Sequence, residues 1–304
     1  MAPRFVHLRL HTEYSIADGM ARVDEAVAAA AADGMPALAI TDAGNLFGAI
    51  KFYEAARAAG VQPVVGVDLW LTNERNRDSA YRIALLARSR AGYLHLCDLL
   101  TRAHAENHWR GRAEVRREWL RGLEGLIALS GFEQGDVGMA LASGNREQAR
   151  ELAAGWAADF PSAYYLEIQR VDPVRAAPMV NATVALAADL GLPVVATHPV
   201  QFLKREHFQA HEARVCIAQG YVLGDNRRPR ACERRYSSID SPLGVGKSGR
   251  RLLPRVNSKA QRRAISTEFS RASGRSANSS AISAWVLKYW LGRKARGRRL
   301  SPST

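Results

Sequence analysis

The sequence predicts an α/β fold over residues 1–230 of its 304 residues, followed by a basic tail over residues 231–304. Up to residue 230, short apolar runs of strand type alternate with helical segments of about 10–15 residues. This alternation is typical of βαβ units, a parallel sheet and a barrel. In the tail the alternation stops, and Ser, Arg and Gly dominate. Such a composition buries too little apolar surface to offset chain entropy, so we expect a largely disordered tail.

The first half of the α/β region supplies four expected strands and two expected helices. An extended apolar run over residues 5–10 precedes an Ala-rich helix over 23–32, which ends at Asp33-Gly34. The run ALAIT predicts a buried strand over 37–41. Residues 46–59 place apolar side chains near helical spacing, and Gly60 ends that helix. Further apolar runs predict strands over 63–71 and 82–87.

The second half continues the alternation with three helices and three strands. Helices are expected over residues 93–104, 147–158 and 176–190, the last of them closed by Gly191. Apolar runs predict strands over 126–130, 164–169 and 193–197. Because helices separate most of these strands, the connections are those of a parallel sheet.

Composition excludes several classes of protein. The tail carries 17 Lys and Arg against 3 Asp and Glu, so the whole net charge of +14 lies in it and the α/β region is neutral. The basic pI therefore describes the tail only. Three scattered cysteines without a CxxC motif argue against a disulfide framework and a zinc knuckle. No signal peptide or long apolar run is present, so we expect a cytoplasmic protein.

The first strand places His7, Arg9 and His11 at a period of two, hence on one face. Two imidazoles on one face, with Asp18 soon after, could begin a metal cluster. The alternative is a strand whose polar side chains simply face a barrel mouth. The sequence pattern taken alone favours this second interpretation.

Further polar residues follow other expected strands. Asp42 comes after a buried strand, Asp68 ends the next one, and the segment 197–201 (THPVQ) ends a late strand. In α/β barrels, side chains at the carboxyl ends of strands carry the chemistry. The alternative is that Asp42 or Asn45 only caps the next helix. These positions predict a site, or the remains of one, at one end of the sheet.

Two motifs in the tail are weaker. Residues 244–248 (GVGKS) imitate a phosphate-binding loop, but the required earlier glycine is Ser241 and no strand precedes it, so nucleotide binding is rejected. The basic run over residues 293–299 could contact phosphates non-specifically. A solvated tail without a partner is the preferred interpretation of that run.

Several long segments together resemble the polymerase-and-histidinol-phosphatase (PHP) domain, which opens the alpha subunit of bacterial DNA polymerase III. They are FVHLRLHTEYSIADGMARVDE, GMPALAITDAGNLFGAIKFYEAARAAGVQPVVGVDLW, GLIALSG, GLPVVATHPVQFL and AHEARVCIAQGYVLGD. The match runs in order from residue 1 to about 230. It implies a distorted (β/α)7 barrel of the PHP type, incomplete at its C-terminal end.

The resemblance also implies the positions of a vestigial metal site. Active members of the family use nine ligand positions, mostly His and Asp or Glu. Here His11, Asp18 and Asp68 keep ligand-capable side chains, while the other six positions do not. Arg, Ala, Phe and Pro offer no lone pair, and Gln offers only a weak carbonyl. The vestigial positions, with Asp42 beside Ala43, are Arg9, His11, Asp18, Asp42, Ala43, Asp68, Arg82, Phe132, Pro199 and Gln201.

From this loss we expect a catalytically silent domain with no catalytic residue and no cofactor, in which residual ligands could hold a divalent metal only weakly. Arg9 and Arg82 are expected to pair with Asp18, Asp42 or Asp68 in place of cations. The resemblance implies a part in DNA replication as a portion of a DNA-directed DNA polymerase, a nucleotidyltransferase that uses magnesium in full-length form. The chain itself is expected to lack polymerase and phosphoesterase activity.

The resemblance further implies partners: the proofreading exonuclease subunit, other replicase subunits, and DNA in the full-length context, with no membrane. Three alternatives remain open. They are an active metal-dependent phosphoesterase of the PHP superfamily, a nucleic-acid-binding adaptor that uses the basic tail, and a truncated fragment without function. The abrupt change of composition suggests that residues from about Ala231 onward are translated out of frame.

Overall fold

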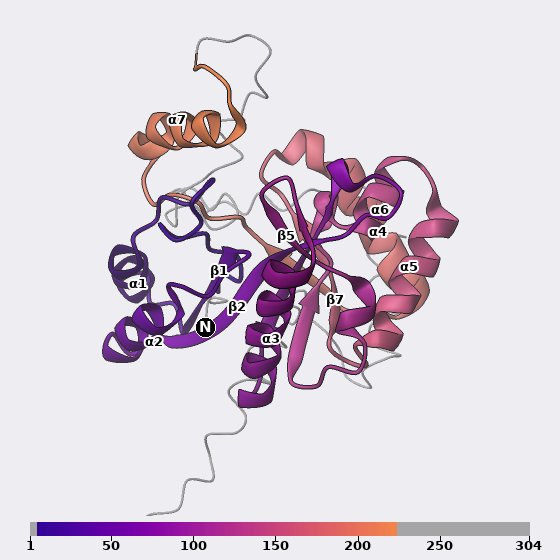
Figure 1. Cartoon of the computed structure of the whole chain (residues 1–304), viewed down its shortest axis with the longest axis horizontal. Helices are drawn as coiled ribbons and strands as arrows, with labels where there is room; N and C mark the ends of the chain where they lie inside the picture. The colour runs from indigo at the N-terminus through magenta and orange to yellow at the C-terminus, as the bar shows by residue number, and fades with distance from the viewer. Residues whose placement is uncertain (1–4, 224–304) are drawn as a thin grey trace, which may run out of the picture. The chain divides into compact units, whose positions relative to one another are not determined.

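The computed structural model describes residues 5–223, and the expected disordered tail over 231–304 lies outside the described residues. Within them, one mixed sheet is surrounded by helices (Figure 1). No helix in this range is long and apolar enough to cross a bilayer. Because the residues beyond 223 are not described, the division of the chain at residue 230 stays a prediction.

Six strands form the wall of the barrel in the order β1-β2-β3-β6-β7-β8. A short hairpin, β4 and β5, extends the sheet from the end of β2. The bounds are β1 Ala37–Ala43, β2 Gln62–Leu71, β3 Tyr81–Ala87, β4 His108–Trp109, β5 Arg112–Val115, β6 Leu126–Leu129, β7 Tyr164–Gln169 and β8 Val194–Thr197.

The N-terminal segment closes the barrel between β1 and the chain that follows β8. The amide of Ala39 donates to the carbonyl of His7, and Leu10 forms a parallel bridge with Val200. Six strands and this segment therefore make a ring of seven members. The expected α/β barrel of seven units is confirmed, and its distortion has two visible causes.

The first cause is the N-terminal segment itself, where the prediction of a regular strand over residues 5–10 is wrong. The amide of Leu10 donates to the hydroxyl of Thr41 at 2.9 Å, not to a backbone carbonyl. A side chain thus takes the place of one rung of the ladder. The segment stays extended but pairs as isolated bridges.

The second cause is β3, which runs antiparallel to both of its neighbours, β2 and β6. The expectation of a parallel sheet is wrong for this strand. Residues 72–80 connect β2 to β3 with one short 3₁₀ turn and no helix. A parallel pair needs a crossover of about a dozen residues or more, so this shorter link returns the chain as an antiparallel neighbour.

Helices α1 to α6 lie around the outside of the barrel, whereas α7 lies apart from the other helices (Figure 1). α1 and α2 pack together beside β1 and β2, while α4 packs on α5 and α6 packs on β7. The bounds are α1 Val23–Ala32, α2 Ala49–Ala58, α3 Arg90–Glu106, α4 Asp136–Ala142, α5 Arg146–Asp159, α6 Pro173–Leu190 and α7 Phe208–Gln219.

Local signals explain where several helices begin and end. Ser89 and Asn145 accept hydrogen bonds at the N-termini of α3 and α5. Asp172 does the same for α6, and Gly191 ends that helix in the left-handed region at a φ of 64°. α2 begins at Ala49, three residues after the predicted start, because the Asn45 side chain accepts from the amide of Phe47 and holds a turn there.

Two apolar clusters hold the structure together. The larger one joins β2, β3, β6 and β7 to α3, α4 and α5, with Trp156 almost fully buried at its centre. The smaller one joins the N-terminal segment and β1 to α1 and α2, around Phe52. The two clusters position the strand ends, and the charged side chains of the site belong to neither of them.

Candidate functional site

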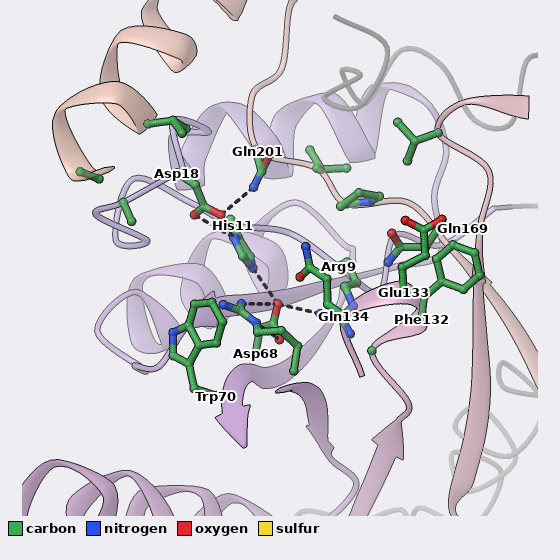
Figure 2. A pocket seen from close by; sticks show the side chains of 18 of the residues that line it. Arg9, His11, Asp18, Asp68, Trp70, Phe132, Glu133, Gln134, Gln169 and Gln201 are labelled. Carbon is green, nitrogen blue, oxygen red and sulfur yellow. Dashed lines mark hydrogen bonds and ion pairs between the residues drawn. The ribbon is translucent and has the colours of Figure 1, made fainter. Parts of the chain in front are cut away.

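A cavity of about 580 Å³ opens where the strands end (Figure 2). Eight of the ten positions predicted for the vestigial metal site line it. Only Asp42 and Ala43 lie outside the lining. The eight are Arg9, His11, Asp18, Asp68, Arg82, Phe132, Pro199 and Gln201.

Six paired charged side chains form a network at the base of the cavity, which we call the charged floor: Arg9, His11, Asp18, Asp68, Arg82 and Glu167. Arg9 lies at the centre of this network. Its Nε and Nη2 atoms donate to the two oxygens of Glu167, both at 2.7 Å, which is a bidentate pair. Its Nη1 atom lies 2.6 Å from Asp68 Oδ2. The guanidinium therefore bridges carboxylates from β7 and β2. Its burial opposes the charged form, but Asp68 and Glu167 outweigh burial and raise the pKa of Arg9.

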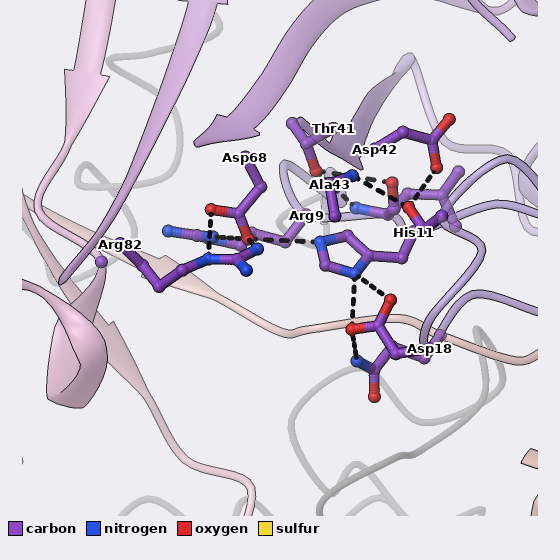
Figure 3. A network of polar contacts seen from close by, with 12 residues as sticks. Arg9, His11, Asp18, Thr41, Asp42, Ala43, Asp68 and Arg82 are labelled. Carbon is purple, nitrogen blue, oxygen red and sulfur yellow. Dashed lines mark hydrogen bonds and ion pairs between the residues drawn. The ribbon is translucent and has the colours of Figure 1, made fainter. Parts of the chain in front are cut away.

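Asp68 forms ion pairs with three cationic groups (Figure 3). Arg82 Nη2 lies 2.6 Å and His11 Nε2 3.2 Å from Asp68 Oδ2, in addition to Arg9. Burial by itself raises the pKa of a carboxyl group. Here Arg82 and Arg9 outweigh burial and hold the pKa of Asp68 well below its usual range. Arg9 and Arg82 were expected to pair with Asp18, Asp42 or Asp68. In the structure both arginines pair with Asp68.

His11 links this floor to the loop that carries Asp18. Its Nδ1 atom lies 2.9 Å from Asp18 Oδ1, opposite the contact with Asp68. Burial lowers the pKa of an imidazole, but Asp18 and Asp68 outweigh it and raise the pKa of His11 from 6.5 to about 9. At neutral pH the ring is therefore protonated, and both nitrogens donate. Asp18 also accepts from Gln201 Nε2 at 2.6 Å.

Asp42 lies in a different environment one strand away. Its oxygens accept from the amide and hydroxyl of Thr12 at 2.6 and 2.8 Å and from the hydroxyl of Ser15 at 2.6 Å. Burial raises the pKa of Asp42, and these hydrogen bonds offset only part of the rise. Ala43 contributes no side-chain donor, and its amide donates to Ser15. Asp42 thus fixes the loop after His11 and does not cap α2.

Phe132 and Pro199 line the cavity with apolar surface. Phe132 has a φ of 48°, in the left-handed region that a non-glycine residue rarely adopts. The His residue next to Pro199, His198, is buried but not part of the cavity lining; its ring lies 6.3 Å from that of His7. The predicted face of His7, Arg9 and His11 is therefore divided, because only the last two line the cavity.

Sequence reasoning missed Glu167, which anchors the network. Besides Arg9, it accepts from the amide of Gly131 at 3.1 Å, from Gln169, and from the hydroxyl of Thr197. Its side chain is fully buried. The available signal was one acidic residue inside the largely apolar strand YYLEIQ, since a carboxylate in a buried strand needs cations or hydrogen-bond donors nearby.

The residues present do not fit a multinuclear metal site. Guanidinium groups cannot ligate cations, and Arg9 and Arg82 occupy two of the vestigial ligand positions that line the cavity. Within residues 5–223, no group of three or more His, Cys, Asp or Glu side chains is arranged to hold a metal ion. Three cations, from Arg9, His11 and Arg82, instead face the three carboxylates of Asp18, Asp68 and Glu167. Such paired charges can hold the barrel together.

Comparison with known proteins gives one family and a consistent set of relatives. The PHP domain family model matches residues 7–171. DNA polymerase III subunit alpha of Neisseria meningitidis serogroup A is 48% identical over 233 residues, which cover 75% of this chain and 20% of that protein. The same subunit from Escherichia coli K12 is 43% identical over 229 residues, with the same coverage.

Among solved structures, an amidohydrolase from Chromobacterium violaceum with bound sulfate and no metal has 14% identity and a TM-score of 0.49. The alignment covers 69% of this chain and 96% of that one. Relative to the two polymerase subunits, the chain spans about a fifth of their length.

Proposed function

The chain belongs to the PHP domain family, and from that premise we propose that it is a catalytically silent scaffold, the N-terminal part of a replicative DNA polymerase alpha subunit. The polymerase chemistry of such a subunit would lie in the four-fifths of the relatives that this chain does not match. The chain by itself would therefore add no nucleotides and hydrolyse no phosphoester.

One observation carries the proposal: the guanidinium of Arg9 bridges Asp68 and Glu167 at 2.6–2.7 Å. In a metal-dependent phosphoesterase, cations between carboxylates lower the pKa of a bound water and neutralise the phosphoryl group. A guanidinium supplies charge and hydrogen bonds but no coordination site for water. The barrel would keep the charge balance of a metal site without its reactivity.

The proposed partners follow from the same role. A silent domain at the start of a replicase subunit would serve as a docking platform for the proofreading exonuclease subunit and would meet DNA through the full-length protein. Its place of action would be the cytoplasm, where replicases work. The buried, mutually paired charges would hold the barrel in the shape that such a partner binds.

Metal analysis and activity together test the silent site. The purified chain, dialysed against manganese and zinc, should retain far less than one metal per molecule by plasma mass spectrometry and should not hydrolyse p-nitrophenyl phosphate or a phosphodiester analogue. Stoichiometric metal together with hydrolysis that a chelator abolishes would contradict the proposal. That result would support the alternative, a metal-dependent phosphoesterase.

Direct binding tests the scaffold role. The chain should bind the purified exonuclease subunit of Neisseria meningitidis, whose polymerase subunit is 48% identical over the matched region. Surface plasmon resonance with the chain immobilised gives the affinity. Absence of binding, with a chain whose cooperative unfolding shows that it is folded, would contradict the docking role while leaving the silent site unaffected.

A further inference from the structure

We infer that α7 and the loop beside it form a docking surface for the portion of a polymerase alpha subunit that follows the matched region in the relatives. The inference rests on the proposed function, because it takes the chain to be the N-terminal part of such a subunit. Three observations support it: an exposed apolar patch, a helix with few buried residues, and the place of this helix near the end of the region shared with the relatives.

Five exposed apolar side chains make up the patch, which we call the α7 patch: Ile16, Ile217, Tyr221, Val222 and Leu223. Ile217 is 81% exposed and Ile16 is 73% exposed. Arg214 Nε donates to the carbonyl oxygen of Ile16 at 2.7 Å, which joins the loop to α7. Single exposed apolar residues are common, but several at one place are typical of a surface that another protein element covers.

α7 has little buried surface of its own. Of its twelve residues only His211 and Cys216 are buried, and its main contact among the helices and strands is the 3₁₀ turn Arg205–His207 directly before it. Figure 1 shows α7 apart from the other helices. Because short helices gain most of their stability from packing, a helix with so few buried residues is expected to pack against a further element.

One side of α7 indicates the chemistry of that element. Ala210, Ala213 and Ile217 are three and four residues apart, so they lie on the same side of the helix. The small alanines allow a second helix or strand to approach closely, and Ile217 supplies a large apolar contact at the end of the row. None of the three positions carries a charge. This side of the helix therefore fits an apolar protein element better than it fits nucleic acid.

The relatives indicate which element this is. The segment AHEARVCIAQGYVLGD, which contains most of α7 and four of the five patch residues, is the last of the segments that resemble the family. The match covers 75% of this chain but only 20% of the Neisseria meningitidis subunit. α7 thus lies directly before the long polymerase portion of the relatives. Since consecutive parts of a chain usually pack beside one another, that portion is the expected occupant of the α7 patch.

Binding in trans tests the inference. The 304-residue chain is mixed with the Neisseria meningitidis polymerase subunit from which the 233 matched residues have been removed. Surface plasmon resonance should detect association. Ile217→Asp should weaken it by about tenfold or more, because a carboxylate replaces a central apolar contact. Leu94→Asp, at an exposed position on α3, is the matched control and should leave the affinity unchanged. Thermal unfolding shows that each variant is folded.

A second measurement does not require the shortened polymerase subunit to fold alone. Residues 1–230 of this chain replace the matched region of the Neisseria subunit, and hydrogen–deuterium exchange compares this fusion with the 304-residue chain. The amides of α7 should exchange fast in the 304-residue chain, where few residues of the helix are buried, and about tenfold or more slowly in the fusion. The amides of α3 should exchange alike in both proteins.

Protection of α7 in the fusion, together with weaker binding of Ile217→Asp, would support the inference. Equal exchange of α7 in both proteins, unchanged affinity in Ile217→Asp, or no association with a folded polymerase portion would overturn it. Slow exchange of α7 already in the 304-residue chain would overturn it as well, because another part of the chain or a second copy would then cover the patch. Exonuclease binding and metal content test the proposed function separately, so the two failures are distinguishable.

Discussion

Asp68 on β2 and Asp42 on β1 lie on neighbouring strands of the same barrel, yet they are stabilised in opposite ways. Asp68 lies among Arg9, Arg82 and His11, and these cations hold its pKa well below the usual range. Asp42 accepts hydrogen bonds from Thr12 and Ser15, which carry no charge, and burial raises its pKa. Carboxylates one strand apart therefore show two ways to bury a negative charge, with cations and with neutral donors.

The difference also shows which of the two carboxylates links separate strands of the barrel through cations. Only Asp68 takes part in a network that joins separate strands, since Arg9 connects it to Glu167 on β7. Asp42 fixes a local loop. Changes at Asp68 should therefore affect the whole barrel, and changes at Asp42 should affect it less.

The largest expected effect comes from Asp68→Asn. The substitution leaves two guanidinium groups and a protonated imidazole close together with one carboxylate fewer. Breaking a buried charge network by removing one partner costs about 3–5 kcal/mol of unfolding free energy. Chemical denaturation with urea measures the loss. Asp78→Asn is the control, because its ion pair with Arg110 is exposed and should cost less than about 1 kcal/mol; equal losses would contradict the comparison.

The pH dependence of stability tests the cation side of the network. His11 has a folded-state pKa of about 9, above the unfolded value of 6.5. Its contribution is fully present below pH 6.5 and is lost as the pH rises to 9. The unfolding free energy should therefore fall across this window, by up to about 3 kcal/mol. Denaturation at a series of pH values measures it, and in His11→Gln the slope across the window should flatten; an unchanged slope would count against a charged His11.

Asp42→Asn should have a smaller effect than Asp68→Asn. The new amide keeps one acceptor but turns an NH₂ group toward the donors of Thr12 or Ser15. We expect a loss of about 1–2 kcal/mol, partly offset because the buried charge is removed. Urea denaturation of the two variants side by side gives the ratio. If Asp42→Asn proved the more damaging of the two, the two carboxylates would not differ as the network indicates.

The smallest expected effect is that of a chelator. If guanidinium groups hold the floor together, no bound ion contributes to stability, so EDTA should shift the melting temperature by less than a degree. A ligand that binds only the folded state stabilises it by mass action, and its removal would be visible as a large drop. Differential scanning calorimetry with and without EDTA decides this, and added zinc or manganese provides the reverse comparison.

Much of the fold could be predicted from apolar patterning. The helix over residues 23–32 is observed with the predicted bounds, and the strand at 164–169 likewise. α7 was missed because its apolar residues do not repeat along one face, and only His211 and Cys216 of the helix are buried. The direction of β3 was missed because the alternation pattern reports that a strand exists, but not which way it runs.

The candidate site was predictable in its location but not in its pairing. Polar residues at strand ends predicted a common rim, and eight of the ten positions do line one cavity. The partner of Arg9 could not be deduced, since Glu167 is 158 residues away and meets it only when the barrel closes. Charge content in a sequence shows which groups need compensation, whereas the fold decides which of them meet.

Anomalous diffraction from crystals soaked in manganese or zinc tests the central claim most directly. The account predicts no anomalous peak within coordination distance of Asp68 and His11, and continuous density for the Arg9 guanidinium between Asp68 and Glu167. A strong peak ligated by His11 and Asp68, with Arg9 and Arg82 turned away, would show that the barrel still holds a metal and would contradict the account.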